Sequence, residues 1–205
     1  MRPDTEKRKQ RSIWIELPVL ALVAILVAVG VRTFLVQTFF IPSGSMENTL
    51  LVDDRVLVNK VVYSLRDPER GEIVVFVPPP GWNAGSGKED YIKRVIGVGG
   101  DRVVCCDAQN RVTVNGRALV EEYLFPGDAP SSQPFDVTVP TRRLFLLGDH
   151  RSASADSRFH LDADLGTVPV DLVVGRAFVI FWPPGRMGGL SIPDTFSQVP
   201  VPAGG

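Results

Sequence analysis

Hydrophobic residues are unevenly distributed along the chain, and the longest apolar run lies near the N-terminus. Residues 13–31 are almost wholly apolar and are interrupted mainly by Glu16 and Pro18. A run of this length is close to the roughly 20 residues that a helix needs to cross a bilayer. Residues 2–11 carry five basic side chains, which predicts that the N-terminus lies in the cytoplasm and that the following chain lies outside. The pattern therefore predicts one membrane anchor.

A cleaved secretory signal is the alternative interpretation of the same segment. A basic head followed by an apolar stretch also fits a signal peptide, and Ala28-Val29-Gly30 offers a small-x-small cleavage site. The apolar run is longer, however, than the core of about 7–15 residues that is typical of a signal peptide. We therefore interpret residues 13–31 as an uncleaved transmembrane anchor.

Beyond the anchor, the chain changes to short runs of β-branched and apolar residues that are separated by turn-forming residues. Residues 32–41 are typical of a helix end that passes into a strand. Asn115-Gly116 is a strong signal for a tight turn. The 19 glycines and 17 prolines favour turns over long helices. Strands are predicted at residues 55–63, 72–77, 91–96, 102–105, 111–114 and 143–147, and within residues 170–182.

These patterns predict a mainly β protein, in which an antiparallel-sheet domain is attached to one N-terminal transmembrane helix. From Pro183 onward the chain is expected to be poorly ordered, because it is rich in proline and glycine. The loop before and including Trp82 is expected to be exposed, with the indole in the membrane interface. The expected organisation is a basic cytoplasmic tail at residues 1–12, the anchor at 13–31, an extracytoplasmic β-rich domain at 32–190 and a Pro/Gly-rich tail at 191–205.

Charge and composition exclude several classes of function. The chain has 22 basic and 23 acidic residues, so nothing indicates a surface for nucleic acid. Its two histidines are distant from its two cysteines, and together they lack the spacing of a metal site. No metal and no cofactor are therefore expected. The adjacent Cys105 and Cys106 could be free thiols, an intermolecular bridge or a vicinal bridge, and the sequence assigns them no function.

Two serines that are separated by one glycine, Ser43 and Ser45, are the candidate chemistry just beyond the anchor. A serine attacks an acyl carbon only when a base removes its proton and donors hold the developing oxyanion. Gly44 would let the backbone turn tightly enough to bring the serine hydroxyl and nearby N–H groups to one point. A polar turn between two strands is the alternative interpretation, so a base must be identified.

Lys93 is the best candidate for that base. His150 is unfavourable because the adjacent Asp149 cannot readily present its carboxylate to the ring, and His160 is less favourable still. Lys93 lies inside a predicted core strand, where burial would lower the pKa of its amine and make it a neutral base. Alternation along the strand predicts that Lys93 points inward and Arg94 outward. The alternative is a lysine on the exposed face of an edge strand.

Three segments together resemble the type I signal peptidases (the bacterial leader peptidase family), which are membrane-anchored Ser/Lys proteases that remove signal peptides. The segments are Pro-Ser-Gly-Ser-Met at 42–46, Asp-Tyr-Ile-Lys-Arg-Val-Ile-Gly at 90–97 and Gly-Asp-His-Arg-Ser-Ala-Ser-Ala-Asp-Ser-Arg at 148–158. They occur in the family's order behind a suitable anchor, and the resemblance covers most of the chain.

The resemblance implies a role for each matching residue. Ser45 matches the nucleophile and Lys93 the general base. Ser43 matches a serine whose hydroxyl lies in the oxyanion hole beside the N–H of Ser45, and Ser154 matches a serine that orients the lysine. The residues that match positions holding the site together are Asp149, Asp156 and Arg158. An ion pair between the last two is expected to brace their loop.

The sequence departs from the family pattern at three positions. Asn48 stands where proline is common, and His150 replaces the usual asparagine. Asp53 stands where a glycine often precedes the aspartate that Asp54 matches. These departures concern the surroundings of the dyad and leave its two members unchanged.

The implied substrate is a secretory preprotein with small side chains at alternate positions of its cleavage site. An extended peptide that lies beside a strand can be read in this way, with backbone hydrogen bonds fixing the chain and shallow pockets excluding bulky side chains. Plain core packing is an alternative interpretation of each pocket residue taken singly. The residues that the resemblance places in such pockets are Phe39, Ile41, Pro42, Met46, Leu50, Tyr91 and Ile92.

The expected function is that of a single-pass membrane serine endopeptidase, which acts outside the cytoplasm on secretory preproteins. Membrane lipid is its second expected partner, and nucleic acid is not expected. Cytosolic self-cleaving repressors also use a Ser/Lys dyad, but they lack an anchor and normally carry a DNA-binding domain. The non-enzymatic alternative is a membrane-tethered β-domain that binds extracytoplasmic partners.

Overall fold

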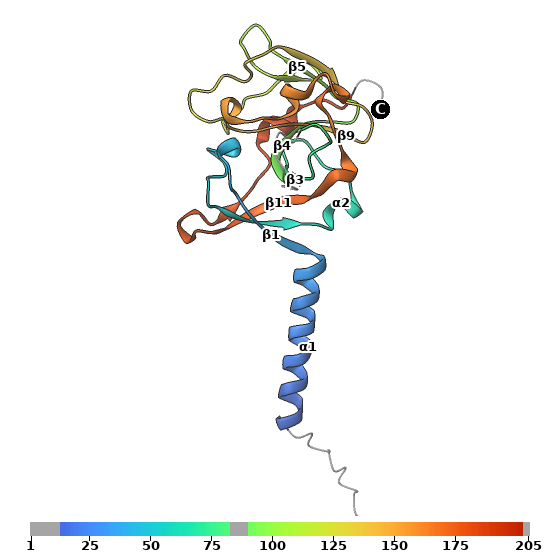
Figure 1. The fold of residues 1–205 in the computed structure, drawn as a ribbon, viewed down its shortest axis with the longest axis vertical. Helices are drawn as coiled ribbons and strands as arrows, with labels where there is room; N and C mark the ends of the chain where they lie inside the picture. The colour runs from blue at the N-terminus through green and yellow to red at the C-terminus, as the bar shows by residue number, and fades with distance from the viewer. Residues whose placement is uncertain (1–12, 83–89, 203–205) are drawn as a thin grey trace, which may run out of the picture.

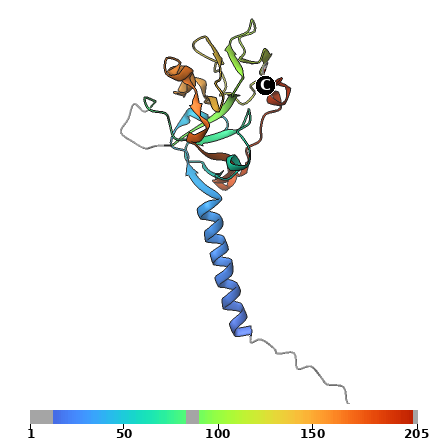
Figure 2. The same ribbon diagram turned by 90° about the vertical axis from the view of Figure 1, so that its right-hand side faces the viewer.

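A long helix and a domain of strands make up the computed structural model, which describes residues 13–82 and 90–202. Helix α1 spans Ile13–Phe34 and projects away from the β domain (Figures 1 and 2). Strand β1, Val36–Phe40, follows after a single residue, as the sequence predicts for residues 32–41. The helix therefore runs almost directly into the edge of a sheet. The expected basic tail at 1–12 lies outside the described residues.

The central part of α1 carries large apolar side chains that the β domain does not cover. The exposed ones are Leu17, Val19, Leu20, Leu22, Val23 and Ile25. Across residues 13–82 and 90–202, no helix combines the length and the apolar character needed to cross a membrane.

Beyond α1, the regular secondary structure consists mainly of antiparallel strands. Their bounds are β1 Val36–Phe40, β2 Arg55–Asn59, β3 Ile73–Phe76, β4 Tyr91–Val98, β5 Arg102–Cys105, β6 Thr113–Val114, β7 Arg117–Ala118, β8 Phe135–Thr138, β9 Arg143–Leu147, β10 Val168–Pro169, β11 Val173–Trp182 and β12 Gly188–Gly189. The short helices are α2 Val62–Leu65 and the 3-10 helices Gly44–Met46, Arg151–Ala153, Ser157–His160, Asp164–Gly166, Val170–Leu172, Pro184–Arg186 and Asp194–Gln198.

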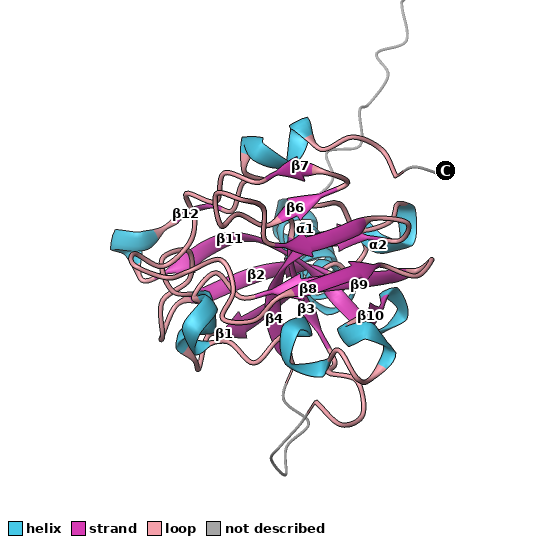
Figure 3. Cartoon of the chain, turned by 90° about the horizontal axis from the view of Figure 1, so that it is seen from above, coloured by secondary structure: helices cyan, strands magenta, loops and turns pink. Residues whose placement is uncertain are grey.

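The larger sheet contains β1, β2, β11, β3, β4, β9 and β10 in that order, with β12 paired to β11. All of its pairings are antiparallel, which confirms the predicted mainly β, antiparallel fold. The long strand β11 lies between β2 and β3 in this order. Figure 3 shows β11 running beside β2. Strand β4 therefore occupies an inner position, between β3 and β9.

The smaller sheet has the order β7, β6, β5 and β8. Strands β5 and β6 form the predicted hairpin, and β6 continues into β7 through Asn115 and Gly116, whose φ angles are 51° and 77°. Positive φ at both central residues is the geometry for which Asn-Gly is preferred in tight hairpins. Strand β8 was not expected, because its short alternating run lies between proline-rich segments that resemble a loop.

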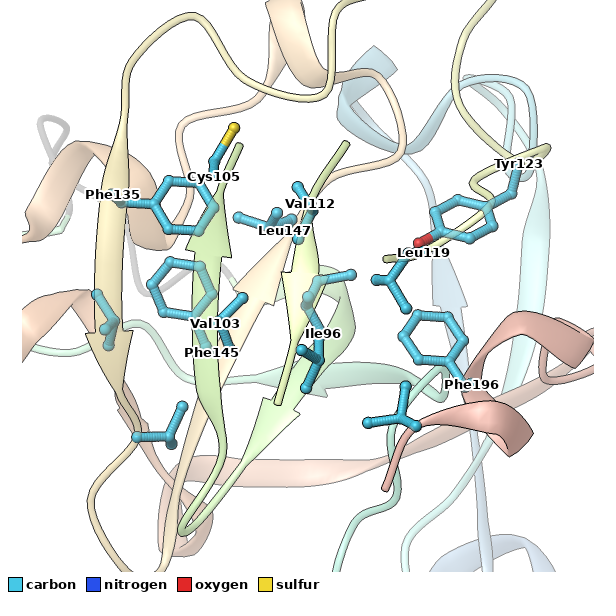
Figure 4. Close-up of a cluster of buried hydrophobic side chains, with 14 residues drawn as sticks. Ile96, Val103, Cys105, Val112, Leu119, Tyr123, Phe135, Phe145, Leu147 and Phe196 are labelled. Atoms are coloured by element: carbon cyan, nitrogen blue, oxygen red, sulfur yellow. The ribbon is translucent and has the colours of Figure 1, made fainter. Parts of the chain in front are cut away.

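At β4 and β9, side chains on both faces of the larger sheet are buried. Ile96, Phe145 and Leu147 pack between the two sheets, in a cluster that also contains residues of the smaller sheet (Figure 4). Val95 and Leu146 belong to a separate cluster. Because successive side chains of a strand point to opposite faces, β4 is covered on both sides. This burial sets the environment of every charged side chain on that strand.

Two expectations about exposed segments were wrong. Trp82 is buried, with its ring edge-on to Phe76 at 6.0 Å and stacked on His160 at 4.4 Å, so its indole does not lie in a membrane interface. In the tail that was expected to be poorly ordered, Phe196 and Val199 pack into the cluster between the sheets. A few apolar side chains thus attach a proline-rich segment to the core.

The adjacent cysteines take one of the three states that the sequence left open. Cys105 and Cys106 form a vicinal disulfide at the end of β5. The Cys105 side chain is buried in the cluster between the sheets.

Candidate active site

The serine-containing segment folds as a short 3-10 helix, Gly44–Met46, between β1 and β2. The amide of Glu47 donates to the carbonyl of Gly44 at 3.0 Å, and the Ser45 side chain is buried. A Cβ atom on residue 44 would lie 2.9 Å from the carboxyl carbon of Glu47. This contact is only with the movable end of a side chain, so the requirement for glycine at this position stays a prediction.

Lys93 lies on β4, and its Nζ is 2.7 Å from Oγ of Ser45. The same amine donates to the carbonyl of Ile92 at 3.0 Å. Burial lowers the pKa of Lys93 from its ordinary value of 10.5 to about 8, although the carboxylates of Asp156 and Asp149 act in the opposite direction. An amine with this pKa is neutral in a useful fraction of molecules near neutral pH.

Arg94, the next residue on β4, was expected to point outward, but it is buried inside the domain. Its guanidinium is buried and binds both carboxylate oxygens of Asp149, at 2.9 and 2.6 Å, and the carbonyl of Gly71 at 2.9 Å. The expectation failed because both faces of β4 are covered, so alternation cannot bring either side chain to water. A bidentate carboxylate and a backbone acceptor satisfy the buried charge instead.

Asp149 also connects the serine segment to the rest of the site. Its second oxygen accepts a hydrogen bond from the hydroxyl of Thr49 at 2.5 Å. Thr49 lies four residues after Ser45, and Asp149 is paired with Arg94. One buried carboxylate therefore joins the serine turn, strand β4 and the loop after β9.

A second buried ion pair braces that loop. Arg158 binds Asp156 through Nε at 2.8 Å and through Nη2 at 2.8 Å. Asp156 also accepts from the amide of Gly148 at 3.0 Å, and Arg158 donates to the carbonyl of Arg151 at 2.7 Å. The expected pairing of Asp156 with Arg158 is thus present, and it closes the loop on itself.

Ser154 lies inside the braced loop, with its side chain buried. Within the described residues, its hydroxyl oxygen has no hydrogen-bond partner, and no bond to Lys93 is formed. A Cβ atom on Gly148 would overlap both the Ser154 hydroxyl and the carbonyl of Ser45. Glycine at 148 therefore allows the loop to pack directly against the serine turn.

An open cavity of about 280 Å³ adjoins the two central side chains. Ser43 is exposed there, on the same wall as Ser45. Three cavity residues were not anticipated, namely Asp90, Ala153 and Ala155; the alternation of small residues around Ser154 is the signal that could have identified the two alanines. The cavity is lined by Pro42, Ser43, Ser45, Asp90, Tyr91, Ile92, Lys93, Ala153 and Ala155.

The expected pocket residues divide into two groups. Pro42, Tyr91 and Ile92 line the cavity. The remaining four do not: Ile41, Met46 and Leu50 are fully buried in a cluster with β2, β3 and β11, and Phe39 packs against that cluster. For these four residues, core packing is what the structure shows.

One edge of β4 is open beside the cavity. On the side of β3, residues Tyr91 to Arg94 of β4 all pair with residues of that strand. On the side of β9, pairing begins only at Arg94, which lies opposite Leu147, the last residue of β9. Among residues 13–82 and 90–202, residues 91–93 therefore have a strand partner on one side only, and they lie next to the cavity.

The two histidines lie apart from the lysine–serine contact. His150 contacts the serine turn through the carbonyl of Gly44, at 3.1 Å, and the carboxylate of Glu47, at 3.0 Å. His160 stacks on Trp82. Within the described residues, neither ring forms a hydrogen bond to the Ser45 hydroxyl, so the only side-chain base in contact with it is Lys93.

Burial of Lys93 predicts a stability effect with a definite sign. Its pKa is about 8 when folded, against an ordinary 10.5, so the unfolded chain binds the extra proton between these pH values. Stability therefore rises with pH across this window, and the full penalty, on the order of 3 kcal/mol, applies below pH 8. Lys93→Met should raise the free energy of unfolding at pH 6.5, and this gain should shrink by pH 10. Urea unfolding of the full chain at both pH values measures it.

The control for this experiment is Lys60→Met, because Lys60 is exposed and its substitution should give no pH-dependent difference. An equal loss of stability at pH 6.5 and pH 10 in Lys93→Met would mean that burial does not penalise the ammonium.

Known proteins resemble this chain in sequence. A profile described as "Signal peptidase, peptidase S26" matches residues 14–182. The chain is 42% identical to a probable signal peptidase I-2 of Synechocystis sp., over 92% of this chain and 84% of that protein. It is 37% identical to signal peptidase I of Mycobacterium tuberculosis, over 91% of this chain and 79% of that protein. A crystal structure of a signal peptidase I from Enterococcus faecalis matches with 28% identity and a TM-score of 0.42, over 54% of this chain and 97% of that one.

The family match covers most of the described residues, and it includes the serine turn and strand β4. Both relatives are aligned over more than three quarters of their own length. This chain belongs to the signal peptidase family, peptidase S26.

Proposed function

We propose that this signal peptidase is a serine endopeptidase in which Ser45 is the nucleophile and neutral Lys93 is the general base. The observation that carries the proposal is the 2.7 Å contact between Nζ of Lys93 and Oγ of Ser45 at the wall of an open cavity. Proton transfer requires a base within hydrogen-bond reach and with a pKa near the working pH. Lys93 meets both conditions, because burial lowers its pKa to about 8.

The chemistry follows from these two side chains. The Lys93 amine takes the hydroxyl proton while Oγ of Ser45 bonds to the carbonyl carbon of the scissile peptide, and the C=O electron pair moves to oxygen. When the intermediate collapses, the C–N bond breaks and the ammonium gives its proton to the leaving amine. Water then attacks the acyl ester while Lys93 takes one of its protons. When the ester C–O bond breaks, the ammonium returns that proton to Oγ of Ser45, and the new carboxyl group leaves.

Ser154 is proposed to orient Lys93 by accepting one of the hydrogen bonds that its amine can donate. A neutral amine has two N–H donors and one lone pair. If the lone pair faces Ser45, the two donors need acceptors, and the carbonyl of Ile92 supplies one at 3.0 Å. The buried hydroxyl of Ser154 is unpartnered within the described residues, and it is the proposed acceptor for the other. Pairing of both donors would fix the lone pair toward the serine.

The oxyanion is proposed to be bound by the hydroxyl of Ser43 and the backbone N–H of Ser45. Both residues line the cavity, and they are two positions apart on one turn. Donors that are already aimed at the developing charge lower the barrier without reorganisation during the reaction.

The proposed substrate is an extended preprotein segment that pairs with the open edge of β4. In the described part of the chain, no strand pairs with residues 91–93 on the side of the cavity, so an added strand could form backbone hydrogen bonds there. Alternate side chains of such a strand would point into the cavity. The cavity is about 280 Å³ in volume, which favours small side chains at alternate positions of the cleavage site.

We also propose that the N-terminal segment tethers the domain to a membrane, with the catalytic domain outside the cytoplasm. The sequence supports this proposal through the basic residues before position 12 and the apolar run at 13–31. The apolar side chains at the centre of α1 are exposed. Their burial in lipid would remove apolar surface from water.

The dyad can be tested by cleavage of a secretory precursor that carries a small-x-small site. Ser45→Ala and Lys93→Met should each reduce kcat/KM at least about a thousandfold, because the two groups act as one unit. Lys60→Met is the matched control for the lysine and should be unaffected. A precursor with phenylalanine in place of one small residue should not be cleaved. Undiminished cleavage in either dyad variant would contradict the assignment, and no cleavage by the wild type would favour a binding module.

The pH dependence gives a second test with a predicted sign. Because only neutral Lys93 accepts the serine proton, kcat/KM should rise about tenfold per pH unit below the pKa and level off above it. The midpoint should lie near pH 8. Initial rates across pH 5.5–10 measure this profile. A midpoint between pH 6 and 7 would instead point to a histidine base.

The tether can be tested with lysine substitutions in α1. A lysine at the centre of a membrane helix costs about 2.5–3.5 kcal/mol, so Leu20→Lys combined with Val23→Lys should release the full chain from vesicles during a carbonate wash. Leu65→Lys is the control, because Leu65 is an exposed apolar residue of the β domain. Retention of the double variant in the membrane fraction would contradict a tether through this helix.

A further inference from the structure

His150 holds the serine turn at two consecutive carbonyl groups. Its backbone N–H donates to the carbonyl of Ser45 at 3.2 Å, and its ring Nδ1 lies 3.1 Å from the carbonyl of Gly44. Nδ1 is also 3.0 Å from a carboxylate oxygen of Glu47, and the ring stacks on Phe125 with centroids 3.9 Å apart. The ring is therefore fixed in orientation, with one nitrogen directed at the turn.

The partners of Nδ1 determine where the ring proton lies. A carbonyl oxygen only accepts hydrogen bonds, and so does an ionised carboxylate. Nδ1 must therefore carry a hydrogen to bind Gly44 and Glu47, in the neutral ring as well as in the imidazolium. The neutral ring is then the Nδ1–H tautomer, whose lone pair is on Nε2.

The carbonyl of Gly44 and the N–H of Ser45 belong to the same peptide unit. In a trans peptide these two groups lie in one plane and point in opposite directions. Whatever holds the carbonyl therefore also directs the N–H. The Gly44 carbonyl has two lone pairs and accepts from the amide of Glu47 at 3.0 Å as well as from His150. Its two hydrogen bonds fix the peptide plane.

We propose that His150 is a positioning residue for the oxyanion hole: by binding the Gly44 carbonyl, its Nδ1–H directs the Ser45 N–H toward the oxyanion. The proposal rests on the proposed function, in which that N–H is an oxyanion donor. A hydrogen bond to the carbonyl also polarises the peptide, which makes its N–H a better donor. His150 acts through the backbone and is not the base.

Asparagine is a second side chain that can place an N–H donor where Nδ1 of His150 lies. The amide nitrogen of asparagine is the same number of bonds from the backbone as Nδ1 of histidine. Asparagine at 150 would therefore place an N–H donor near the Gly44 carbonyl without a titratable ring. Leucine has nearly the shape of asparagine but no donor, so the two substitutions differ in the feature that the proposal requires.

The kinetic test compares His150→Asn with His150→Leu in the full chain, using the precursor assay. Loss of a whole oxyanion donor costs about a hundredfold to a thousandfold in kcat, and a donor that is retained but less well aimed should cost about tenfold. We expect His150→Leu to lower kcat about tenfold with KM within about twofold, and His150→Asn to keep kcat within about threefold. The pH midpoint of both variants should match the wild type.

His160→Leu is the matched control, because His160 stacks on Trp82 and forms no side-chain hydrogen bond to the serine turn in the described part of the chain. An unchanged kcat in His150→Leu overturns the proposal. So does a kcat in His150→Asn as low as that in His150→Leu, since the ring itself would then be required. If His150→Leu fails to fold, His150→Gln replaces it, because its amide lies one bond further from the backbone.

The tautomer can be measured independently of activity. In the His160→Leu chain, His150 is the only histidine, and nitrogen NMR shifts of its neutral ring should report a hydrogen on Nδ1. A hydrogen on Nε2 overturns the proposal whatever the kinetics show. If Ser45→Ala still cleaves precursor while the Nδ1–H tautomer is observed, the proposed function fails and the geometry of His150 stands.

Discussion

The contact between Lys93 and Ser45 places an amine inside the domain, where burial lowers its pKa to about 8. An ammonium in this position is penalised by burial, and nearby carboxylates would restore it if they were unpaired. The two carboxylates that act on Lys93, those of Asp149 and Asp156, are each bound by a buried arginine. Each pair removes much of the negative potential that would favour the ammonium. The acidic and basic residues around the site therefore offset one another and leave desolvation as the dominant influence on the lysine.

The fold brings three segments that are distant in sequence to one point. The serine turn leaves the edge of the larger sheet, Lys93 lies on an inner strand, and the loop after β9 closes over both. Thr49 and Arg94 meet on Asp149, so these segments are joined by direct hydrogen bonds as well as by packing. Because the charged groups are buried, loss of one partner would leave an unpaired charge in the interior. Removal of one member of a buried pair is therefore expected to destabilise the domain.

Local pattern was sufficient to predict most strands and the Asn-Gly turn. It made Ser45 and Lys93 candidates, and the resemblance of three segments to a family selected them. Local pattern was insufficient where long-range packing decides burial. Arg94 is typical of an exposed strand position, yet the covering of both faces of β4 and the presence of Asp149 make it an interior residue. Trp82 and Phe196 lie in segments rich in proline and glycine, whose order comes from contacts with remote aromatic and apolar side chains. The residues next to Trp82 and Phe196 in the sequence do not indicate those long-range contacts.

The open edge at residues 91–93 has a consequence for which chains can reach the serine. Its free backbone groups can pair only with a segment whose own N–H and C=O groups are not already paired. A helix or an inner strand of a folded protein does not meet that condition. Folded domains passing the cavity would thus be spared regardless of their sequence, and the recognised feature would be an extended conformation together with small side chains. With the proposed substrate pairing, selectivity of this kind would protect mature proteins without any dedicated contact to them.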